Sequence, residues 1–167
     1  DKNAGYEYFH GTVLDEPVKP LMWPKLYYGL MSSTDKVYLN PVQIYELDYK
    51  DVFSALQAKP VIIDKCNISN IIEDSNTIIP IPKTIELFDI ELNGKTLTIN
   101  LSDDIENVYG DMEKNYQMMI DSILYSYTSF KSIDNVQILI DGEKTNDFYG
   151  YDLSSPIKAN KYINLEK

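Results

Sequence analysis

The sequence predicts an α+β domain in which two helices pack on one face of a mixed or antiparallel sheet. Three observations support this class: a long amphipathic segment at residues 112–131, several short apolar runs bounded by turn residues, and the order of these patterns along the chain. Read from the amino end, the expected order of elements is ββ-α-ββ-α-ββ. The 44% apolar fraction of the 167 residues is ordinary for one globular domain with a hydrophobic core.

The first two strands are expected to form a hairpin. Residues 26–31 and 37–44 are strand-like, and the turn-forming residues 32–35 join them. Pro41 lies in the second run and has no N–H to donate to a neighbouring strand. The second strand is therefore expected at an edge of the sheet or at a bulge.

A short helix with one buried face is expected after this hairpin. Asp48 stands where a helix N-cap belongs, and Pro60 ends the run. The apolar side chains between them recur at helical spacing: Tyr49, Val52, Phe53 and Leu56. Residues 61–63 can add a brief strand, and residues 64–77 are expected to form a long connection.

The second hairpin is expected around Asn93-Gly94. This pair favours a tight turn because asparagine and glycine tolerate positive φ. Before it, the apolar positions change phase by one residue between Leu87 and Phe88, which predicts a bulge or kink there. After it, residues 95–101 alternate between apolar and polar, so one face of this strand is expected to be buried.

The long helix is expected to be followed by a buried strand. Asp111 and Glu113 stand at the positive end of the helix. Its apolar stripe consists of Tyr116, Met119, Ile120, Ile123, Leu124 and Tyr127. Residues 136–140 are nearly all apolar, so this strand should be covered on both faces or lie centrally in the sheet. Residues 148–153 are expected to supply a last short strand.

The chain is expected to contain one domain with a segment at each end. Residues 1–24 contain several prolines and little periodicity, which is typical of a tether. The domain is expected to span residues 25–158, and residues 159–167 form a C-terminal tail. The start at Asp1, without methionine, suggests either a trimmed chain or a mature form, and residues 1–24 are expected to follow a removed signal segment or lipid anchor.

The charge of the chain argues against nucleic acid as a partner. The 26 acidic and 15 basic residues give a net charge of −11, which repels phosphate backbones. All 15 basic residues are lysines, so the chain has no guanidinium group for bidentate binding of phosphate.

No catalytic residue, cofactor or metal site is expected. His10 and Cys66 are the sole histidine and cysteine of the chain, so neither has the sequence partners that metal binding or nucleophilic catalysis needs. Asp103, Asp104 and Glu106 could hold calcium, but their spacing lacks the alternating ligands of a dedicated loop, and a solvated cap for the next helix is preferred. Paired carboxylates, as in a glycosidase, are kept as a hydrolase hypothesis.

The 14 tyrosines provide the candidate contact residues. Four of them, near the two ends of the domain, are taken as a candidate interface: Tyr27, Tyr28, Tyr149 and Tyr151. Tyrosine is enriched at protein interfaces, and its ring can also stack on carbohydrate. Ordinary strand composition, a protein interface and a glycan contact are the three interpretations of this cluster.

Four segments, in a fixed order, carry a resemblance to a known family. They are Asp-Val-Phe-Ser-Ala-Leu-Gln-Ala-Lys-Pro at 51–60, Ile-Pro-Lys-Thr at 81–84 with Thr-Ile-Asn-Leu-Ser at 98–102, the helix at 118–130 ending Tyr-Thr-Ser-Phe, and Val-Gln-Ile-Leu-Ile-Asp-Gly at 136–142 with Asp-Leu-Ser-Ser-Pro at 152–156. Together they resemble the GerM domain family of sporulation and spore germination, a GerMN-type lipoprotein domain. Members usually read Gly-Pro where this chain has Lys59-Pro60.

The resemblance implies an extracytoplasmic, membrane-anchored protein of a Gram-positive bacterium, typically a lipoprotein, with no known catalytic site. It also implies a fold similar to the ring-building modules of envelope-spanning secretion machines. The leading hypothesis is therefore a non-enzymatic envelope module of sporulation or germination that works by protein contact, with itself or with other envelope or sporulation proteins. The alternative is a cell-wall glycan or peptidoglycan-binding lipoprotein of vegetative cells.

Overall fold

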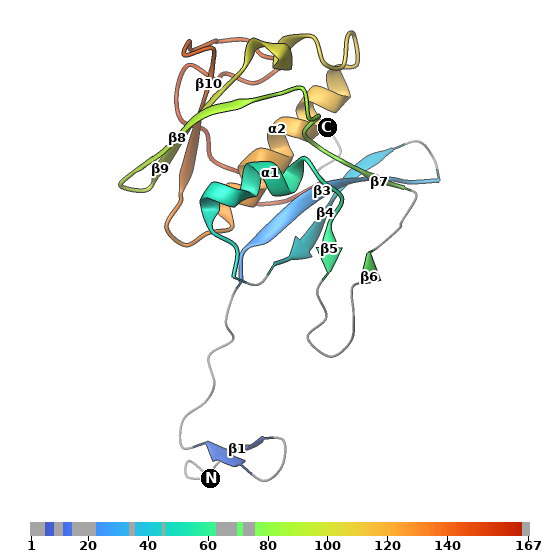
Figure 1. Ribbon diagram of the computed structural model, residues 1–167, viewed down its shortest axis with the longest axis vertical. Coiled ribbons are helices and arrows are strands. Elements are labelled where there is room, and N and C mark those ends of the chain that lie inside the picture. Colours follow the sequence, from blue (N-terminus) through green and yellow to red (C-terminus); the bar gives the residue numbers. More distant parts are fainter. Residues whose placement is uncertain are drawn as a thin grey trace.

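The computed structural model confirms the α+β class (Figure 1). It describes residues 6–8, 12–14, 23–33, 36–44, 46–62, 70–71 and 76–164. Within these residues, the chain forms two three-stranded sheets, two α-helices and two further two-stranded pairs. The strands are thus divided between sheets, where the sequence suggested a single one.

The first sheet has the order β4-β3-β7 and is antiparallel throughout. β3 (Lys25–Met31) and β4 (Val37–Gln43) form the predicted hairpin, and β7 (Thr77–Ile78) pairs with the second half of β3. Pro41 lies opposite Tyr27, and β4 is an edge strand, as a proline without an N–H requires.

The second sheet has the order β10-β9-β8. β8 (Leu87–Asn93) and β9 (Thr96–Leu101) are antiparallel, whereas β9 and β10 (Asn135–Ile140) are parallel. A parallel pair needs a crossover connection, and the long helix lies in that connection. Alternate residues of β9 are buried, as the apolar alternation predicted.

The β8–β9 hairpin was predicted to contain a bulge and a tight turn. The predicted bulge is confirmed, because the register shifts between Leu87 and Asp89. The hairpin is confirmed, but its turn lies one residue later than expected, because Asn93 pairs with Thr96. Of the two loop residues only Gly94 has a positive φ, of 60°, which fits a type II′ turn and not type I′.

Both predicted helices are present. A 3₁₀ turn at Tyr49–Asp51 leads into α1 (Val52–Leu56), and the Asp48 carboxylate accepts a hydrogen bond of 2.9 Å from the Lys50 N–H. The long helix α2 spans Glu113–Thr128, and every member of its predicted apolar stripe is buried. Both helices contact β3 and each other.

β10 is covered on both faces, as its apolar sequence predicted. Val136, Gln137 and Ile138 are consecutive residues, so their side chains point alternately to the two faces, and all three are buried. The strand lies at the edge of its sheet and not centrally, and a bridge between Val136 and Ile157 covers its outer side.

The expected last strand at residues 148–153 is wrong. Phe148 and Tyr151 face each other across a tight turn, with N–H to C=O distances of 2.8 and 3.0 Å. Tyr149 and Gly150 between them have φ values of 50° and 87°, so both central residues are left-handed, as in a type I′ turn. Tyrosine rarely adopts a positive φ, so Tyr149 gave no signal for this turn in the sequence.

The two short pairs lie in segments that the sequence assigned to a tether and a connection. β1 (Tyr6–Tyr8) pairs with β2 (Thr12–Leu14), and β5 (Val61–Ile62) pairs with β6 (Asn70–Ile71). β5 is the brief strand expected after the first helix.

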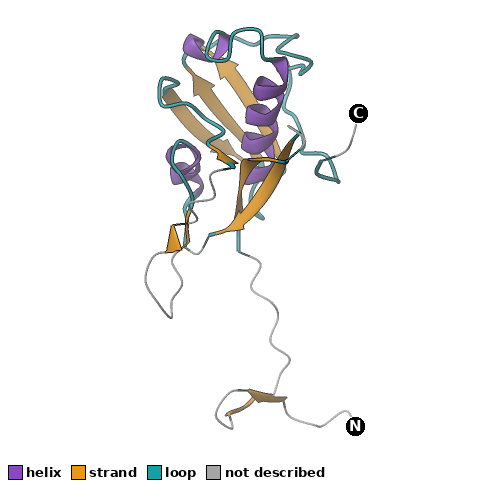
Figure 2. Ribbon diagram, turned by 90° about the vertical axis from the view of Figure 1, so that its right-hand side faces the viewer, coloured by secondary structure: helices purple, strands orange, loops and turns teal. Residues whose placement is uncertain are grey.

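Helix α2 contacts both three-stranded sheets, as the side view shows (Figure 2). Its apolar stripe belongs to one core with the inward side chains of β9: Leu97, Ile99 and Leu101. Burial of these side chains supplies the main driving force for joining the helix to this sheet.

Towards β3, α2 and its C-cap residue Ser129 present serines beside apolar contacts such as that of Met118 with Gly29. Ser122 donates to the Tyr27 carbonyl, and the Tyr27 N–H donates to Ser126 Oγ at 3.0 Å. Ser129 Oγ accepts from the Lys25 N–H at 2.9 Å and donates to the Lys25 carbonyl at 3.1 Å. These backbone groups lie on the side of β3 that β4 does not occupy, so the helix serines satisfy them where no strand does.

Candidate functional site

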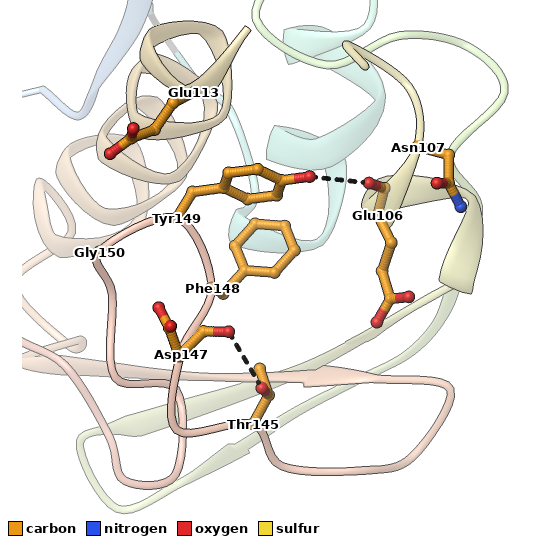
Figure 3. Close-up of a pocket in the computed structure, with 8 residues that line it drawn as sticks. All are labelled: Glu106, Asn107, Glu113, Thr145, Asp147, Phe148, Tyr149 and Gly150. Atoms are coloured by element: carbon orange, nitrogen blue, oxygen red, sulfur yellow. Dashed lines mark hydrogen bonds between the residues drawn. The ribbon is translucent and has the colours of Figure 1, made fainter. Parts of the chain in front are cut away.

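Two hollows lie on either side of the tight turn at residues 148–151. The first, here called the acidic hollow, has a volume of about 550 Å³ and is lined in part by Glu106, Glu113, Asp147 and Tyr149 (Figure 3). The second, here called the tyrosine groove, has a volume of about 540 Å³ and is lined in part by the rings of Tyr38, Tyr125, Tyr151 and Tyr162. Each hollow contains one of the tyrosines selected from the sequence.

The acidic hollow is assembled from three separate segments. Glu106 ends the 3₁₀ turn Asp103–Glu106, Glu113 begins α2, and Asp147 precedes the tight turn. The three carboxylates are exposed to solvent. A glycosidase acid needs a carboxyl group held in an apolar pocket, and these exposed side chains do not provide one. The hollow therefore brings several carboxylates together, as the hydrolase hypothesis requires. It does not bury them, although a glycosidase acid needs a buried carboxyl group.

Tyr149 is held rigidly in this hollow. Its ring is stacked on that of Tyr116 at a centroid distance of 3.7 Å and an interplanar angle of 3°. Its hydroxyl donates to the Glu106 carbonyl at 3.0 Å, which Figure 3 shows. The neighbouring Tyr116 hydroxyl raises the pKa of Tyr149 to about 12, so the phenol stays neutral and keeps its proton for this bond.

The tyrosine groove is formed where α2, the start of β4 and the C-terminal segment meet. Residues 160–164, which the sequence assigned to a tail, form one wall of it. Asn164 fastens this wall, because its side chain accepts from the Leu39 N–H at 2.7 Å and donates to the Leu39 carbonyl at 3.1 Å. The Tyr125 hydroxyl also holds the wall, because it donates to the Tyr162 carbonyl at 2.8 Å.

The rings in the groove are fixed by their own contacts. The Tyr151 hydroxyl donates to Asp121 Oδ1 at 2.6 Å, and the Tyr125 ring packs on Tyr27 at 5.4 Å. Burial, and then contact with the Asp121 carboxylate, raise the pKa of Tyr151 far above its usual value. Burial also raises the pKa of Tyr125. These phenols are neutral hydrogen-bonding groups at physiological pH.

The four candidate interface tyrosines differ in burial and in location. Tyr28 is 2% exposed, and its hydroxyl donates to the Ala55 carbonyl at 2.9 Å. This is a correction, because a residue in the core has no ring surface to offer a partner. Tyr27 is half-buried under Tyr125, and Tyr149 and Tyr151 lie at the two hollows. The contact role of these three stays a prediction.

Sequence reasoning missed most of the tyrosine groove. A signal for its helical part existed, because groove residues of α2 recur every three or four positions: Lys114, Gln117, Met118, Asp121 and Tyr125. The contributions of residues 160–164 had no such signal, because they depend on how the C-terminal segment folds back.

The remaining sequence candidates give no site. Within the described ranges, no three residues of the types His, Cys, Asp and Glu are grouped so that they could hold a metal ion. Asp103 and Asp104 lie in the 3₁₀ turn that precedes α2. His10 and Cys66 lie outside the described residues.

The domain is a two-sheet α+β module with two hollows, one at the start of α2 and one along the length of this helix. The family model Germane, described as sporulation and spore germination, matches residues 25–146, and the chain belongs to this family. The resemblance stated from the sequence is therefore confirmed. None of the helices in the described part of the chain has the length and apolar character that crossing a membrane requires.

Two solved structures from Bacillus subtilis are similar in fold. The tandem GerMN domains of the sporulation protein GerM match with a TM-score of 0.58 at 14% identity, covering 89% of this chain and 50% of that one. The first GerMN domain alone matches with a TM-score of 0.53 at 15% identity, covering 81% of this chain and 95% of that one. The chain thus spans about half the length of the tandem structure. No curated protein matches the sequence.

Proposed function

We propose that this chain is a non-enzymatic, extracytoplasmic module of sporulation or spore germination that acts by protein contact. It is tethered to the membrane through the polypeptide before its domain, and it binds other envelope proteins or further copies of itself in a ring. Membership of the sporulation and germination family is the observation that carries this proposal. The exposure of the three carboxylates in the acidic hollow supports a binding role over a catalytic one.

The acidic hollow is the contact surface that we assign to the protein partner. Its three carboxylates form a negative patch, which attracts a basic partner surface and repels an acidic one. Tyr149 adds a rigid aromatic ring, which loses little conformational entropy on binding. A rigid aromatic group surrounded by charge is typical of a protein contact.

A charge reversal tests this assignment. The variant Glu106→Lys/Asp147→Lys reverses two exposed carboxylates of the hollow, and Glu86→Lys/Glu91→Lys reverses two exposed carboxylates elsewhere as a matched control. Crosslinking pull-down from sporulating cells and size-exclusion chromatography with light scattering measure partner capture and self-association. We expect the first variant to lose partner capture or self-association and the control to retain it.

Two results would contradict the proposal. One is a wild-type protein that stays monomeric and captures no envelope protein. The other is partner capture that is equal in the wild type and in both charge-reversed variants. Cell fractionation tests the compartment separately, and recovery of the mature chain in the cytosol would remove the extracytoplasmic assignment.

A further inference from the structure

The tyrosine groove differs in chemistry from the acidic hollow beside it. Besides its four tyrosine rings it contains the side-chain amides of Gln117, Asn160 and Asn164. Aromatic faces pack on the C–H faces of a sugar ring, and amides can both donate to and accept from hydroxyl and acetamido groups. A groove with both kinds of group suits a saccharide.

The groove is also less acidic than the hollow. Lys36 and Lys114 line it together with a single carboxylate, Asp121, which accepts a hydrogen bond from the Tyr151 hydroxyl. The acidic hollow has three carboxylates among its lining residues, and the whole chain has a net charge of −11. The groove is therefore a place where this acidic protein favours an anionic group.

The sheet edge beside the groove disfavours a peptide that binds as an added strand. Such binding needs free backbone N–H and C=O groups along β4. The outward groups of Leu39 are occupied by the Asn164 side chain, and Pro41 has no N–H. Recognition in this groove must therefore come from side chains, which is how a saccharide is bound.

The groove is preorganised for such a ligand. Contacts with Asp121, with the Tyr162 carbonyl and with Tyr27 hold the rings of Tyr151 and Tyr125 in place. A ligand that packs against fixed rings does not have to order them, so little binding energy is lost.

From this combination we propose that the tyrosine groove binds an acidic oligosaccharide of N-acetylated amino sugars, with carboxylates on its sugar units. The rings stack on the sugar faces, the Asn160 amide and the Gln117 Oε1 atom bind the acetamido and hydroxyl groups, and Lys114 attracts the carboxylate. Cell-wall glycan carries free carboxylates on its sugars only where the stem peptides have been removed, and the assignment of that form as the ligand rests on the extracytoplasmic location proposed above. The site itself is independent of the protein contact at the acidic hollow.

Isothermal titration calorimetry of the full chain tests the proposal. The probe is a tetrasaccharide of alternating N-acetylglucosamine and N-acetylmuramic acid, and the comparison ligand is the uncharged tetramer of N-acetylglucosamine. We expect saturable binding of the acidic probe, weaker binding of the neutral one, and a fall in affinity for the acidic probe as salt is raised.

Two variants at exposed positions, each with a matched control, locate the site. Tyr162→Ala removes an exposed ring of the groove, and we expect it to weaken binding about 5- to 10-fold, the loss that one aromatic contact predicts. Lys114→Gln removes an exposed charge, and we expect it to weaken binding about 2- to 5-fold. Phe88→Ala and Lys131→Gln change an exposed ring and an exposed lysine outside the groove and should leave affinity unchanged.

The readouts separate this proposal from the protein-contact function. Neither groove variant should alter partner capture, and the charge reversal at the acidic hollow should not reduce saccharide affinity. Absence of saturable saccharide binding by the wild type would overturn the proposal. So would equal affinity in the wild type and both groove variants, or an acidic peptide that binds the groove while the saccharide does not.

Discussion

Helix α2 is joined to its two sheets by different interactions. Towards β9 and β10 it contributes an apolar stripe to a continuous core. Towards β3 it contributes hydroxyl groups, and Ser122 and Ser126 bond to the backbone of Tyr27. The difference follows from the backbone, because part of β3 has no neighbouring strand on that side and its N–H and C=O groups need partners. Serines that recur at helical spacing can therefore satisfy the backbone groups of a strand that has no neighbouring strand on that side.

The outer edge of the same sheet shows a related arrangement. There the Asn164 amide bonds to both backbone groups of Leu39, as a neighbouring strand would. Side chains thus bond to backbone groups at both edges of β4-β3, one set from α2 and its C-cap and one from the exposed Asn164. Edge groups that are already bonded are not available for unwanted strand addition. Four substitutions test how much each kind of contact contributes.

The largest effect is expected at the apolar side of α2. Ile99 is 0% exposed in β9, so Ile99→Ala removes buried methylene groups and leaves a cavity. We expect the free energy of unfolding to fall by about 2–5 kcal/mol, as such core truncations do. Urea denaturation followed by circular dichroism measures it. The control Glu91→Ala, at an exposed position on β8, should stay within about 0.5 kcal/mol of the wild type.

The second effect is expected where Met118 of α2 packs on Gly29 of β3. A Cβ added at Gly29 would overlap with Met118 Sδ and would lie 3.0 Å from Ile78 Cβ. We expect Gly29→Ala to reduce the free energy of unfolding by about 1–3 kcal/mol through overpacking. In a double-mutant cycle, Met118→Ala should relieve part of this loss. Strictly additive losses would show that the clash is not the cause.

The third effect is expected at the serines. Ser126→Ala leaves the Tyr27 N–H without its acceptor, and we expect a loss of about 1 kcal/mol in the free energy of unfolding, the size of one net hydrogen bond. Ser132→Ala, at an exposed position beyond the helix, is the matched control. An equal stability of the two variants would argue against this role of the α2 serines.

The smallest global effect is expected at the outer edge. Asn164 is exposed, so Asn164→Ala should change the free energy of unfolding by no more than about 0.5 kcal/mol. Its effect should be local, because the Leu39 N–H loses its acceptor. Hydrogen exchange should therefore accelerate at Leu39, while exchange at Ile99 in the core is unchanged. Unaltered exchange at Leu39 would show that Asn164 does not hold the edge.

Several features were predictable because they depend on neighbouring residues alone. The slip in apolar phase at Leu87 and Phe88 located the bulge, and Pro41 located the edge strand. The burial of Tyr28 was also predictable from alternation, because it shares a strand face with the buried Leu26, whereas Tyr27 points to the other face. Because neighbouring strand residues point to opposite faces, the choice of both Tyr27 and Tyr28 as interface residues was inconsistent with this alternation.

Other features of the site could not be predicted locally. The turn at Tyr149 and Gly150 places a tyrosine at positive φ, and its stability comes from stacking on Tyr116, which is distant in sequence. The wall of the tyrosine groove depends on Asn164 reaching Leu39 across most of the chain. Such contacts are decided by packing, and residue patterns do not encode them directly.

The sequence by itself determined the α+β class, the two helices with their buried faces, and the family, because periodicity, turn residues and segment order are local properties. The tertiary structure decided how the strands divide into two sheets and where side chains replace strands. It also decided that an acidic hollow and a less acidic groove lined by tyrosines lie on either side of one turn. The physical reason is that backbone hydrogen bonds must be satisfied and apolar surface buried at once, and the partners that achieve this are distant in sequence.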